Sequence, residues 1–377
     1  MKIKKNICIA INSLAMGGAE KQCLLLAKAL KTFHNLVVVV VDPTEEIHPD
    51  RLDNLEKEAI DAVYLPKNQL LKITEFTRLL RKRKIEIVFS YLPTDTVLSA
   101  ICAKLVKVPY KFGGIRNSFL PRFKLIVLRF VHNFLLNYTI ANNYAGYQAA
   151  IAFGYKNRVL VIPNGIEIRP LLPKEYTSKR ITIISLGRLV SQKKYDIAIQ
   201  TIAHLKTILN KDYNIFYKIV GQGPQENAIL DAINKYGLQK DIELIKDAPD
   251  IYALLEASDI YLCTSFFEGI SNAIMEAMNC GLPIVATDVG DNSRLIMDNT
   301  SGYLVPVNDY EALANKLNEL IESPIMRKKM GVAGHIHLAK NFGYKAYQKK
   351  YLDLIENIEN IEIRNGEVFF EKERKLS

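Results

Sequence analysis

The sequence predicts an α/β protein of two domains, each built on an open and mostly parallel β-sheet. Its 377 residues are enough for two domains of ordinary size, and 49% hydrophobic with 24% charged residues is normal for globular proteins with buried cores. Short runs rich in valine and isoleucine alternate with longer segments whose apolar residues recur at helical spacing. Residues 166–180, with two prolines and mixed charge, have the composition of a linker between two such series.

The first series begins with a βαβ unit. Residues 6–12 and 36–42 are continuous β-branched runs, typical of parallel strands buried on both faces, and residues 20–33 between them have helical spacing. The expected elements that follow are strands at 60–65, 86–90, 110–113, 138–141 and 158–162, and helices at 70–83, 94–106, 121–136 and 143–152. We expect them to form an N-terminal domain over residues 1–164.

A second alternating series begins at Ile181 and predicts a further domain over residues 165–341. Residues 307–340 have a helical pattern at its end, and residues 342–358 read as another amphipathic helix. The remaining tail, residues 359–377, is rich in acids and bases, and we expect it to be either loose or a short appendage.

The composition argues against several classes of protein. The five cysteines are scattered and odd in number, which disfavours a disulfide framework or a zinc site and favours reduced thiols in the cytoplasm. Their positions are Cys8, Cys23, Cys102, Cys263 and Cys280. The basic and then apolar start of the chain imitates a signal peptide, but its apolar run is short and leads into Gly17 and Gly18, so we interpret it as the first strand. No run of 18 or more apolar residues occurs, so we expect no membrane-spanning helix.

The net charge of +10 is unevenly distributed. Residues 1–164 contain 24 lysines and arginines against 12 acids, whereas residues 165–377 contain 26 against 28. Most of the excess lies in residues 62–164, with 16 basic and 3 acidic residues. A basic half predicts an anionic partner. Nucleic acid is not favoured, because the basic residues are not interleaved with aromatic ones as a reading surface.

The expected helix at 121–136 combines large apolar side chains with basic ones. The apolar members are Phe123, Ile126, Val127, Phe130 and Phe134, and the basic members are Arg122, Lys124, Arg129 and His132. This composition favours insertion into an anionic membrane surface. A core-facing helix with a solvated basic side is the alternative, and the sequence leaves both open. We expect a cytoplasmic protein that associates peripherally with the inner face of the cell membrane.

The stretch from Ser265 to Asp291 is the most informative for chemistry. It follows a short apolar run that reads as a buried strand, and Ser271 and Asn272 are good N-cap residues for a helix. Glu268 would then lie on the loop after the strand, and Glu276 about a turn and a half into the helix. Both can face the carboxyl edge of a parallel sheet, where open α/β folds bind ligands. A surface helix that happens to carry two acids is the alternative.

The segment E-G-I-S-N-A-I-M-E-A-M-N-C-G-L-P-I-V-A-T-D resembles the paired-glutamate motif of retaining GT-B glycosyltransferases, in particular the GT4-like family (glycosyl transferases group 1). The resemblance implies two Rossmann-like domains facing a central cleft, with the helix at 342–358 crossing back to the N-terminal domain. It also implies that Glu276 accepts hydrogen bonds from the ribose of a nucleotide sugar and that Glu268 contacts the transferred sugar. Beside them, the residues expected to line the donor site are Gly269, Ile270, Ser271 and Asn272.

Two cations follow the expected strand at 181–186. Gly187 and Arg188 end this strand, and Lys193 lies five residues further on. The spacing resembles the family's G-R-L-x-x-x-K, which implies that both cations hold the donor's diphosphate. Each charge-assisted hydrogen bond would contribute about 1.5–3 kcal/mol, and the cations would stabilise the leaving nucleoside diphosphate. No Asp-x-Asp occurs, so a metal-held pyrophosphate is not supported, and we expect no metal and no cofactor.

Two glycine-containing loops are further candidates for the donor site. Gly17 and Gly18 lie where the first strand leads into a helix, so backbone N–H groups there could approach a phosphate or the acceptor. Without the resemblance, a tight turn is the simpler interpretation. Gly221 and Gly223 follow another strand, and their spacing alone is weak evidence for dinucleotide binding. The same turn resembles the one that the family places near the nucleotide.

The chain departs from the family's pattern in two loops. In one, Asp291 stands where the family has a second glycine, and Arg294 stands near the family's usual glutamate. In the other, Lys246 and Asp247 replace a glycine near the base, so the sequence does not distinguish a UDP-sugar from a GDP-sugar. No compelling catalytic base is present, and we expect His132 to be a packing or surface residue. The acceptor proton is expected to pass to a phosphate oxygen of the donor, with Arg116 orienting the diphosphate or the acceptor.

The sequence therefore predicts a retaining, metal-independent hexosyltransferase. It would move a sugar from a nucleotide sugar to a lipid-linked or oligosaccharide acceptor, in the biosynthesis of a cell-surface polysaccharide such as lipopolysaccharide or capsule. A catalytically inactive scaffold of the same architecture is the alternative, although such a scaffold would be expected to lose the cations or the glutamates. A nucleotide-sugar epimerase is disfavoured because no acid/base cluster is seen, and a nicotinamide dehydrogenase because the full glycine fingerprint is absent.

Overall fold

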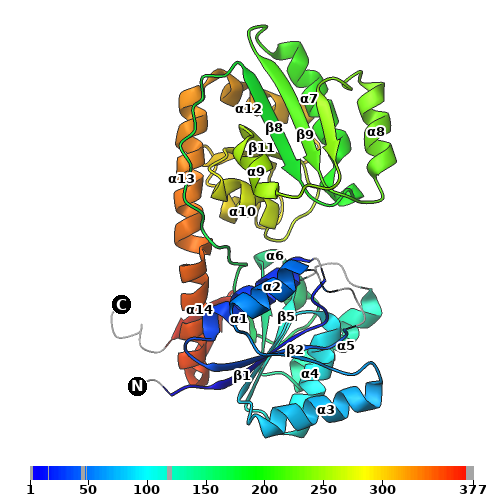
Figure 1. Cartoon of the computed structure of the whole chain (residues 1–377), viewed down its shortest axis with the longest axis vertical. Helices are drawn as coiled ribbons and strands as arrows, with labels where there is room; N and C mark the ends of the chain where they lie inside the picture. Colours follow the sequence, from blue (N-terminus) through cyan, green and yellow to red (C-terminus); the bar gives the residue numbers. More distant parts are fainter. Residues whose placement is uncertain (1–2, 16, 44–46, 48, 117–120, 371–377) are drawn as a thin grey trace. The chain divides into compact units, whose positions relative to one another are not determined.

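The computed structural model describes residues 3–15, 17–43, 47, 49–116 and 121–370. The chain divides into two compact units. Unit 1 comprises Met1–Gly165 and Tyr344–Ser377, and unit 2 comprises Ile166–Gly343. Each unit has its own parallel sheet and its own buried core, and both sheets can be followed by colour in Figure 1.

The described part of unit 1 contains a seven-stranded parallel sheet of order β3-β2-β1-β4-β5-β6-β7. Its strands are β1 (Asn6–Ile11), β2 (Asn35–Val40), β3 (Ala62–Tyr64), β4 (Ile87–Ser90), β5 (Tyr110–Ile115), β6 (Tyr138–Ala141) and β7 (Val159–Val161). The chain first builds outward from β1 to β3 and then restarts on the other side with β4. The point where the strand order reverses therefore lies between β1 and β4, which is where ligands bind in such sheets.

Helices cover both faces of this sheet. They are α1 (Gly18–Leu30), α2 (Pro49–Lys57), α3 (Gln69–Lys82), α4 (Pro93–Leu105), α5 (Arg122–Phe134), α6 (Tyr144–Ala152) and α14 (Tyr344–Glu356). Helices α1 and α14 share one core with the sheet, while α3 and α4 pack against its opposite face. The C-terminal helix thus returns to the N-terminal unit, as the resemblance implied.

The described part of unit 2 repeats the plan with six parallel strands in the order β10-β9-β8-β11-β12-β13. They are β8 (Arg180–Leu186), β9 (Asn214–Val220), β10 (Ile242–Ile245), β11 (Ile260–Cys263), β12 (Ile284–Thr287) and β13 (Gly302–Val305). Here the order reverses between β8 and β11, which pair directly. The predicted α/β class with two Rossmann-like sheets is confirmed.

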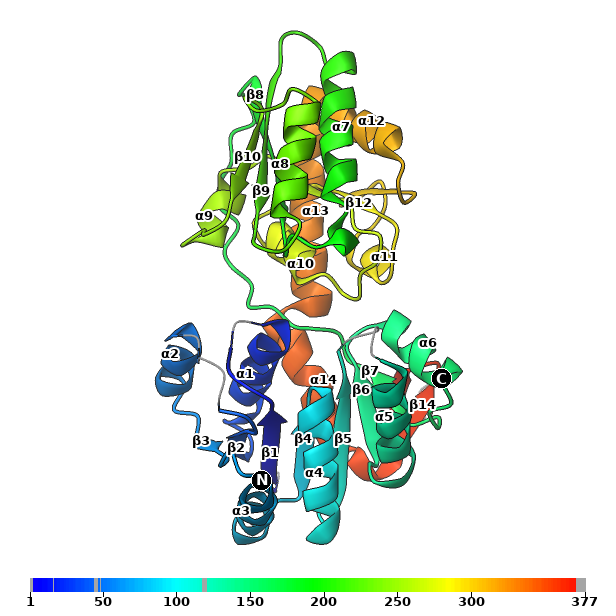
Figure 2. The same cartoon turned by 90° about the vertical axis from the view of Figure 1, so that its right-hand side faces the viewer.

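The helices of unit 2 also lie on both faces of its sheet. They are α7 (Tyr195–Ile208), α8 (Glu226–Lys235), α9 (Ile251–Glu256), α10 (Asn272–Asn279), α11 (Asn292–Leu295), α12 (Tyr310–Glu322) and α13 (Pro324–Phe342). Helices α7, α8 and α12 pack on one face, and α9 and α10 on the other, while α13 contributes Met330 to the first core and Leu338 and Phe342 to the second. Figure 2 shows α7, α8 and α13 beside this sheet.

The helical pattern at 307–340 is not one helix but two, α12 and α13. The break falls at Ser323, whose hydroxyl caps α13 by accepting from the Met326 N–H, and at Pro324, which occupies the first turn of that helix. The buried Arg327 guanidinium donates to the carbonyls of Leu320 and Ile321 at 2.6 Å each. It therefore provides hydrogen-bond partners for carbonyl groups in the last turn of α12.

The tail is ordered over much of its length. Beyond the short helix η2 (Ile358–Asn360), the strands β14 (Ile361–Arg364) and β15 (Glu367–Phe370) form an antiparallel hairpin. The Val161 N–H of β7 donates to the Gly366 carbonyl at 2.8 Å. Of the two expected alternatives, an appendage is correct for 361–370 and a loose tail is wrong there, whereas residues 371–377 lie outside the described residues.

Across the part of the chain that the structure describes, no helix has the length and apolar character needed to cross a bilayer.

Candidate functional site

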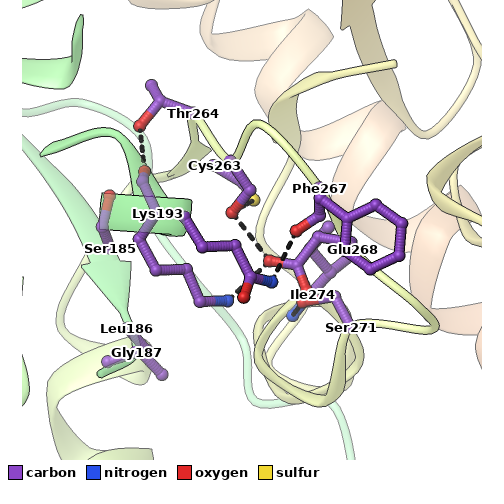
Figure 3. Close-up of polar contacts among 12 residues, drawn as sticks. Ser185, Leu186, Gly187, Lys193, Cys263, Thr264, Phe267, Glu268, Ser271 and Ile274 are labelled. Carbon is purple, nitrogen blue, oxygen red and sulfur yellow. Dashed lines mark hydrogen bonds and ion pairs between the residues drawn. The ribbon is translucent and has the colours of Figure 1, made fainter. Parts of the chain in front are cut away.

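The two loops that flank the reversal point of the unit 2 sheet lie against each other. One follows β8 and contains Gly187, Arg188 and the short helix η1 (Ser191–Lys193). The other follows β11 and leads through Glu268 into α10. Because β8 and β11 are adjacent parallel strands, both loops leave the same carboxyl edge of the sheet, and Figure 3 shows Lys193 and Glu268 pointing toward each other there.

The centre of this site is an ion pair. The Lys193 Nζ lies 2.5 Å from Glu268 Oε1, and the two side chains are only 18% and 9% exposed. Burial by itself would lower the pKa of the Lys193 ammonium, but the facing Glu268 carboxylate outweighs it, and the net direction of that pKa is upward. The ammonium therefore stays charged beside a buried carboxylate.

Backbone and side-chain hydrogen bonds fix the loop that carries Lys193. The Thr264 hydroxyl lies 2.9 Å from the carbonyls of both Lys193 and Lys194. The Gln192 amide donates to the Phe267 carbonyl at 2.7 Å. Lys194 itself adopts the left-handed conformation, with φ of 52°, and this bends the chain into α7. These bonds hold the two loops in register, so the ion pair is built on a rigid frame.

Three predicted donor-site glycines let the loops after β8 and β9 pack together. A Cβ on Gly187 would lie 3.1 Å from Lys193 Cε and 3.5 Å from its Nζ, so the lysine side chain lies over this glycine. A Cβ on Gly221 would overlap the Gly187 carbonyl oxygen, and one on Gly223 would lie 2.5 Å from the Leu189 carbonyl oxygen. Their absent side chains allow backbone to approach backbone; their role in donor binding stays a prediction.

Arg188 lies at the same edge and is exposed. Within the described residues its guanidinium makes no hydrogen bond or ion pair, although it is close enough to Lys193 to oppose that ammonium's charge. A cation held near a second cation without a carboxylate of its own is suited to an anionic ligand.

The residues after Glu268 begin α10. Ser271 caps the helix by accepting from the Ile274 N–H at 3.4 Å, as its N-cap assignment predicted. Ile270 is buried, and Asn272 is the first helical residue. Glu276 is the fifth residue of the helix and is partly exposed, so it remains accessible to a ligand.

The loop after β12 packs on the backbone of Glu268 and Gly269. Gly290 has φ of +55°, and a Cβ there would overlap the Glu268 carbonyl oxygen. The Asp291 N–H donates to the Gly269 carbonyl at 3.3 Å. Asp291, which departs from the family's pattern, is buried as the N-cap residue of α11, so the departure is accommodated structurally.

The departures at Lys246 and Asp247 are paired within unit 2. The Gln222 amide donates to the Asp247 carboxylate, and Lys246 Nζ lies 2.5 Å from Glu226 Oε1. Both pairs join the carboxyl ends of β9 and β10 to the loop and helix beside them. The charges there already have protein partners, which explains how the family's glycine can be replaced.

In unit 1, the predicted loop at Gly17 and Gly18 starts α1. Gly17 is the N-cap residue, and a Cβ on it would overlap the Glu20 carboxylate, which is buried. A carboxylate at a helix N-terminus is electrostatically favoured. A phosphate at this position would have to share it with Glu20.

Arg116 follows β5 and is enclosed by side chains of unit 1. Its Nη1 donates to Asn164 Oδ1 at 3.0 Å, and its guanidinium lies 4.4 Å from the centre of the Tyr91 ring. Burial alone would lower the pKa of this guanidinium, but Tyr351, Tyr91 and Tyr347 reverse the effect and its pKa is raised. Among the described residues, Arg116 Nε has no hydrogen-bond partner. The predicted role of Arg116 in orienting a ligand stays a prediction.

His132 is a packing residue of unit 1, one of the two roles that the sequence predicted. Its Nδ1 lies 2.6 Å from the Thr139 hydroxyl, and its Nε2 lies 3.1 Å from the Lys156 carbonyl oxygen. Burial lowers the pKa of the imidazole to about 4. The ring is therefore neutral at physiological pH and is part of the packed interior of unit 1.

All five cysteines are free thiols. Burial raises the pKa of each of them, so none is activated as a thiolate. In the described ranges, no group of three or more His, Cys, Asp or Glu side chains is placed to hold a metal ion.

The fold and the site place the protein in a class. Proteins of this class have two Rossmann-like units, and charged side chains lie at the carboxyl edge of the second sheet, where its strand order reverses. Residues 172–336, which lie within unit 2, match the family described as glycosyl transferases group 1. This match is confined to residues 172–336, so the likeness to the glycosyl transferases group 1 family is that of unit 2.

Two curated relatives are informative. "Putative colanic acid biosynthesis glycosyltransferase WcaL" of Salmonella typhimurium is 32% identical over 193 residues, which cover 47% of this chain and 45% of the relative. The chain thus spans less than half the length of that relative. A Campylobacter jejuni protein is 23% identical over 94% of this chain and 99% of its own length; it is described as "GalNAc-alpha-(1->4)-GalNAc-alpha-(1->3)-diNAcBac-PP-undecaprenol alpha-1,4-N-acetyl-D-galactosaminyltransferase".

The fold is shared with a solved structure, that of Anabaena Alr3699/HepE in complex with UDP and glucose. The TM-score is 0.80 at 19% identity, and the match covers 93% of this chain and 99% of the other. At this identity the likeness concerns the fold alone, that of a GT-B protein with two Rossmann-like domains.

Sequence reasoning missed the residues that hold the ion pair, namely Gln192, Thr264 and Ser265. A signal was available for Ser265, because a serine three residues before Glu268 can reach back to its carboxylate within one turn of a loop. Nothing in the sequence indicated that Gln192 would bridge to Phe267, since this bond joins residues 75 positions apart.

Proposed function

We propose that this chain is a retaining, metal-independent glycosyltransferase that moves a sugar from a nucleotide sugar to a lipid-linked or oligosaccharide acceptor. The observation that carries the proposal is the buried Lys193–Glu268 pair beside the exposed Arg188, at the reversal point of a group 1 domain. The names of the relatives point to cell-surface polysaccharide synthesis and, for the Campylobacter protein, to an undecaprenol-linked substrate. The Anabaena neighbour binds UDP and glucose, which supports a uridine nucleotide as the first donor to test.

In this proposal, unit 2 binds the donor. Arg188 and Lys193 hold the diphosphate, since both ammonium and guanidinium groups form strong charge-assisted bonds to phosphate. The bond between the anomeric carbon and the diphosphate breaks with its electron pair going to the phosphate oxygen, and the two cations stabilise this developing charge. Glu268 contacts the transferred sugar, and the Glu276 carboxylate accepts hydrogen bonds from the ribose hydroxyls.

The acceptor reacts on the same face of the sugar. Its hydroxyl oxygen forms the new bond to the anomeric carbon, and its proton passes to an oxygen of the departing diphosphate. This route needs no protein base, in keeping with the absence of an identified one. We assign acceptor binding to unit 1.

We further propose that unit 1 docks on an anionic membrane. Residues 96–166 contain nine lysines and arginines and no acid. Helix α5 leaves a row of large apolar side chains in solvent at helical spacing, and Phe123 and Phe134 are 75% and 63% exposed. The complete row is Phe123, Ile126, Phe130 and Phe134. An exposed apolar row beside basic side chains has the pattern of interfacial helices.

A two-step assay tests the transferase. Thermal shift with UDP, GDP and ADP would first rank the nucleotides, because a bound ligand stabilises the folded state by a predictable amount. Transfer from the matching nucleotide sugars to short lipid-diphosphate acceptors is then followed, with the anomeric configuration of the product read by NMR and EDTA present throughout. Nucleotide binding without transfer to any acceptor would favour the inactive scaffold, and an inverted product or a requirement for metal would reject the mechanism.

A second assay tests the membrane partner. Vesicles of phosphatidylglycerol and phosphatidylcholine should pellet the protein, and F123S/F130S should lose this binding. Ile325→Ser is the matched control, because Ile325 of α13 is also 75% exposed but belongs to unit 2. Equal pelleting of all three proteins, or none by the unchanged protein at low salt, would reject membrane docking through α5.

A further inference from the structure

Ser265 makes a contact that the proposed mechanism does not use. Its side chain is completely buried, and its hydroxyl donates to Glu268 Oε1 at 2.7 Å. Lys193 Nζ contacts the same oxygen at 2.5 Å (Figure 3 labels the lysine and the glutamate). Within the described residues, Glu268 Oε2 has no hydrogen bond. One carboxylate oxygen is therefore held twice, while the other is left for a ligand.

Ser265 is itself fixed by buried groups from the neighbouring strand. The Thr287 hydroxyl, at the end of β12, donates to the Ser265 carbonyl at 2.6 Å. The Asn292 amide in turn donates to the Thr287 carbonyl at 2.9 Å. Thr287 and Asn292 are both completely buried. A line of hydrogen bonds thus runs from α11 through the ends of β12 and β11 to the Glu268 carboxylate.

We propose that Ser265 is a positioning residue for glycosyl transfer. By holding Oε1 against Lys193, it fixes the Glu268 side chain in the rotamer that presents Oε2 to the sugar of the donor. Two hydrogen bonds to one oxygen restrict both the position and the orientation of the carboxylate. The flexible side chain of a lysine does not impose this restriction by itself. The inference rests on the proposed function, because it assigns Glu268 to the sugar.

The geometry distinguishes this role from that of any buried hydroxyl. Ser258 provides the matched case, since it precedes the same strand, is also completely buried and donates to the Leu254 carbonyl at 2.7 Å. It lies at the amino end of β11, away from Glu268. Loss of the Ser258 hydroxyl should affect stability alone, whereas loss of the Ser265 hydroxyl should also release Glu268.

The first experiment needs no donor. Acetic anhydride labelling of Lys193, quantified by mass spectrometry, reports how firmly its ammonium is paired. Ser265→Ala should raise the labelling rate of Lys193 severalfold, Ser265→Thr should restore the low rate by replacing the hydroxyl, and Ser258→Ala should leave it unchanged. Circular dichroism confirms that each protein is folded. If Ser265→Ala does not fold, Ser265→Cys takes its place, because cysteine is nearly equal in size to serine and also lacks the hydroxyl.

The second experiment measures transfer from UDP-glucose and binding of UDP. We expect Ser265→Ala to lower kcat/KM roughly 10- to 100-fold through loss of one charge-assisted hydrogen bond, with the Kd for UDP changed by less than about twofold. Equal labelling and equal transfer in Ser265→Ala and Ser258→Ala would overturn the proposal. Failure of the unchanged protein to transfer glucose, galactose or N-acetylgalactosamine from UDP, or mannose from GDP, would refute the proposed function instead, while a raised Lys193 labelling rate would still support the positioning by Ser265.

Discussion

Lys193 and Glu268 face each other at 2.5 Å across the line where the strand order of unit 2 reverses, although 75 residues separate them in the chain. In the ligand-free protein each neutralises the other. A diphosphate that binds Lys193 would compete with the carboxylate for the same ammonium. The pair therefore couples the phosphate end of a donor to the group that is proposed to contact its sugar.

This coupling predicts opposite effects for its two members. Glu268→Gln should leave UDP binding unchanged or tighter, because Lys193 loses a competing anion, but should abolish most transfer. Lys193→Met should weaken UDP binding by about 1.5–3 kcal/mol, the range for one charge-assisted bond. Calorimetric titration with UDP checks both variants. Weaker binding in Glu268→Gln by the same amount as in Lys193→Met would contradict the competition.

Arg188 is predicted to bind the diphosphate without a protein competitor. Arg188→Gln should weaken the binding of UDP by roughly 10- to 100-fold. The binding of uridine, which has no phosphate, should be unaffected. Lys194→Gln serves as the control, since that lysine is already within 4.0 Å of Asp196. Titrations with both ligands decide the matter, and equal losses for UDP and uridine would mean that the substitution disturbs the fold.

Glycine at position 290 is predicted to be essential to the site for a steric reason. Gly290→Ala would place a Cβ on the Glu268 carbonyl oxygen, so the Glu268 loop must move. Gly237→Ala is the control, because Gly237 also has a positive φ, of +66°, but a Cβ there meets nothing within 4 Å. Both should lose about 1 kcal/mol from backbone strain. Only Gly290→Ala should lose more stability than that and also lose transfer, as urea unfolding and a transfer assay would reveal.

Acid should destabilise unit 1 through His132. Burial lowers the pKa of this imidazole from 6.5 to about 4, so the folded state favours the neutral ring. The resulting stabilisation is complete above pH 6.5 and is lost as the pH falls toward 4, with a total of about 3 kcal/mol. His132→Gln should remove part of the drop in unfolding free energy between pH 7 and pH 4.5, as urea unfolding at both pH values would measure. An identical drop in the variant and the unchanged protein would exclude His132 as the cause.

Local patterns were sufficient for most elements, and their failures have physical causes. Helix α2 was not predicted because its sequence, P-D-R-L-D-N-L-E-K, offers only Leu52 and Leu55 to a core. The pattern at 307–340 hid a break at Pro324, because the apolar period continues through the corner where Arg327 ties α13 to α12. Strand β5 continues to Ile115 rather than ending at 113, since Gly114 allows close approach to the end of β4.

The sequence by itself determined the α/β class, the two alternating series, and the residue types of the candidate site: these depend on period, capping and short-range motif, which are properties of neighbouring residues. Only the tertiary structure decided that Lys193 is paired with Glu268 while Arg188 is left open, that Ser265 holds that carboxylate, and that Arg116 is enclosed by tyrosines. These facts depend on which strands lie side by side and on how far backbones approach. Which strands and backbones become neighbours is set by packing across the sheet, so no local stretch of the chain predicts it.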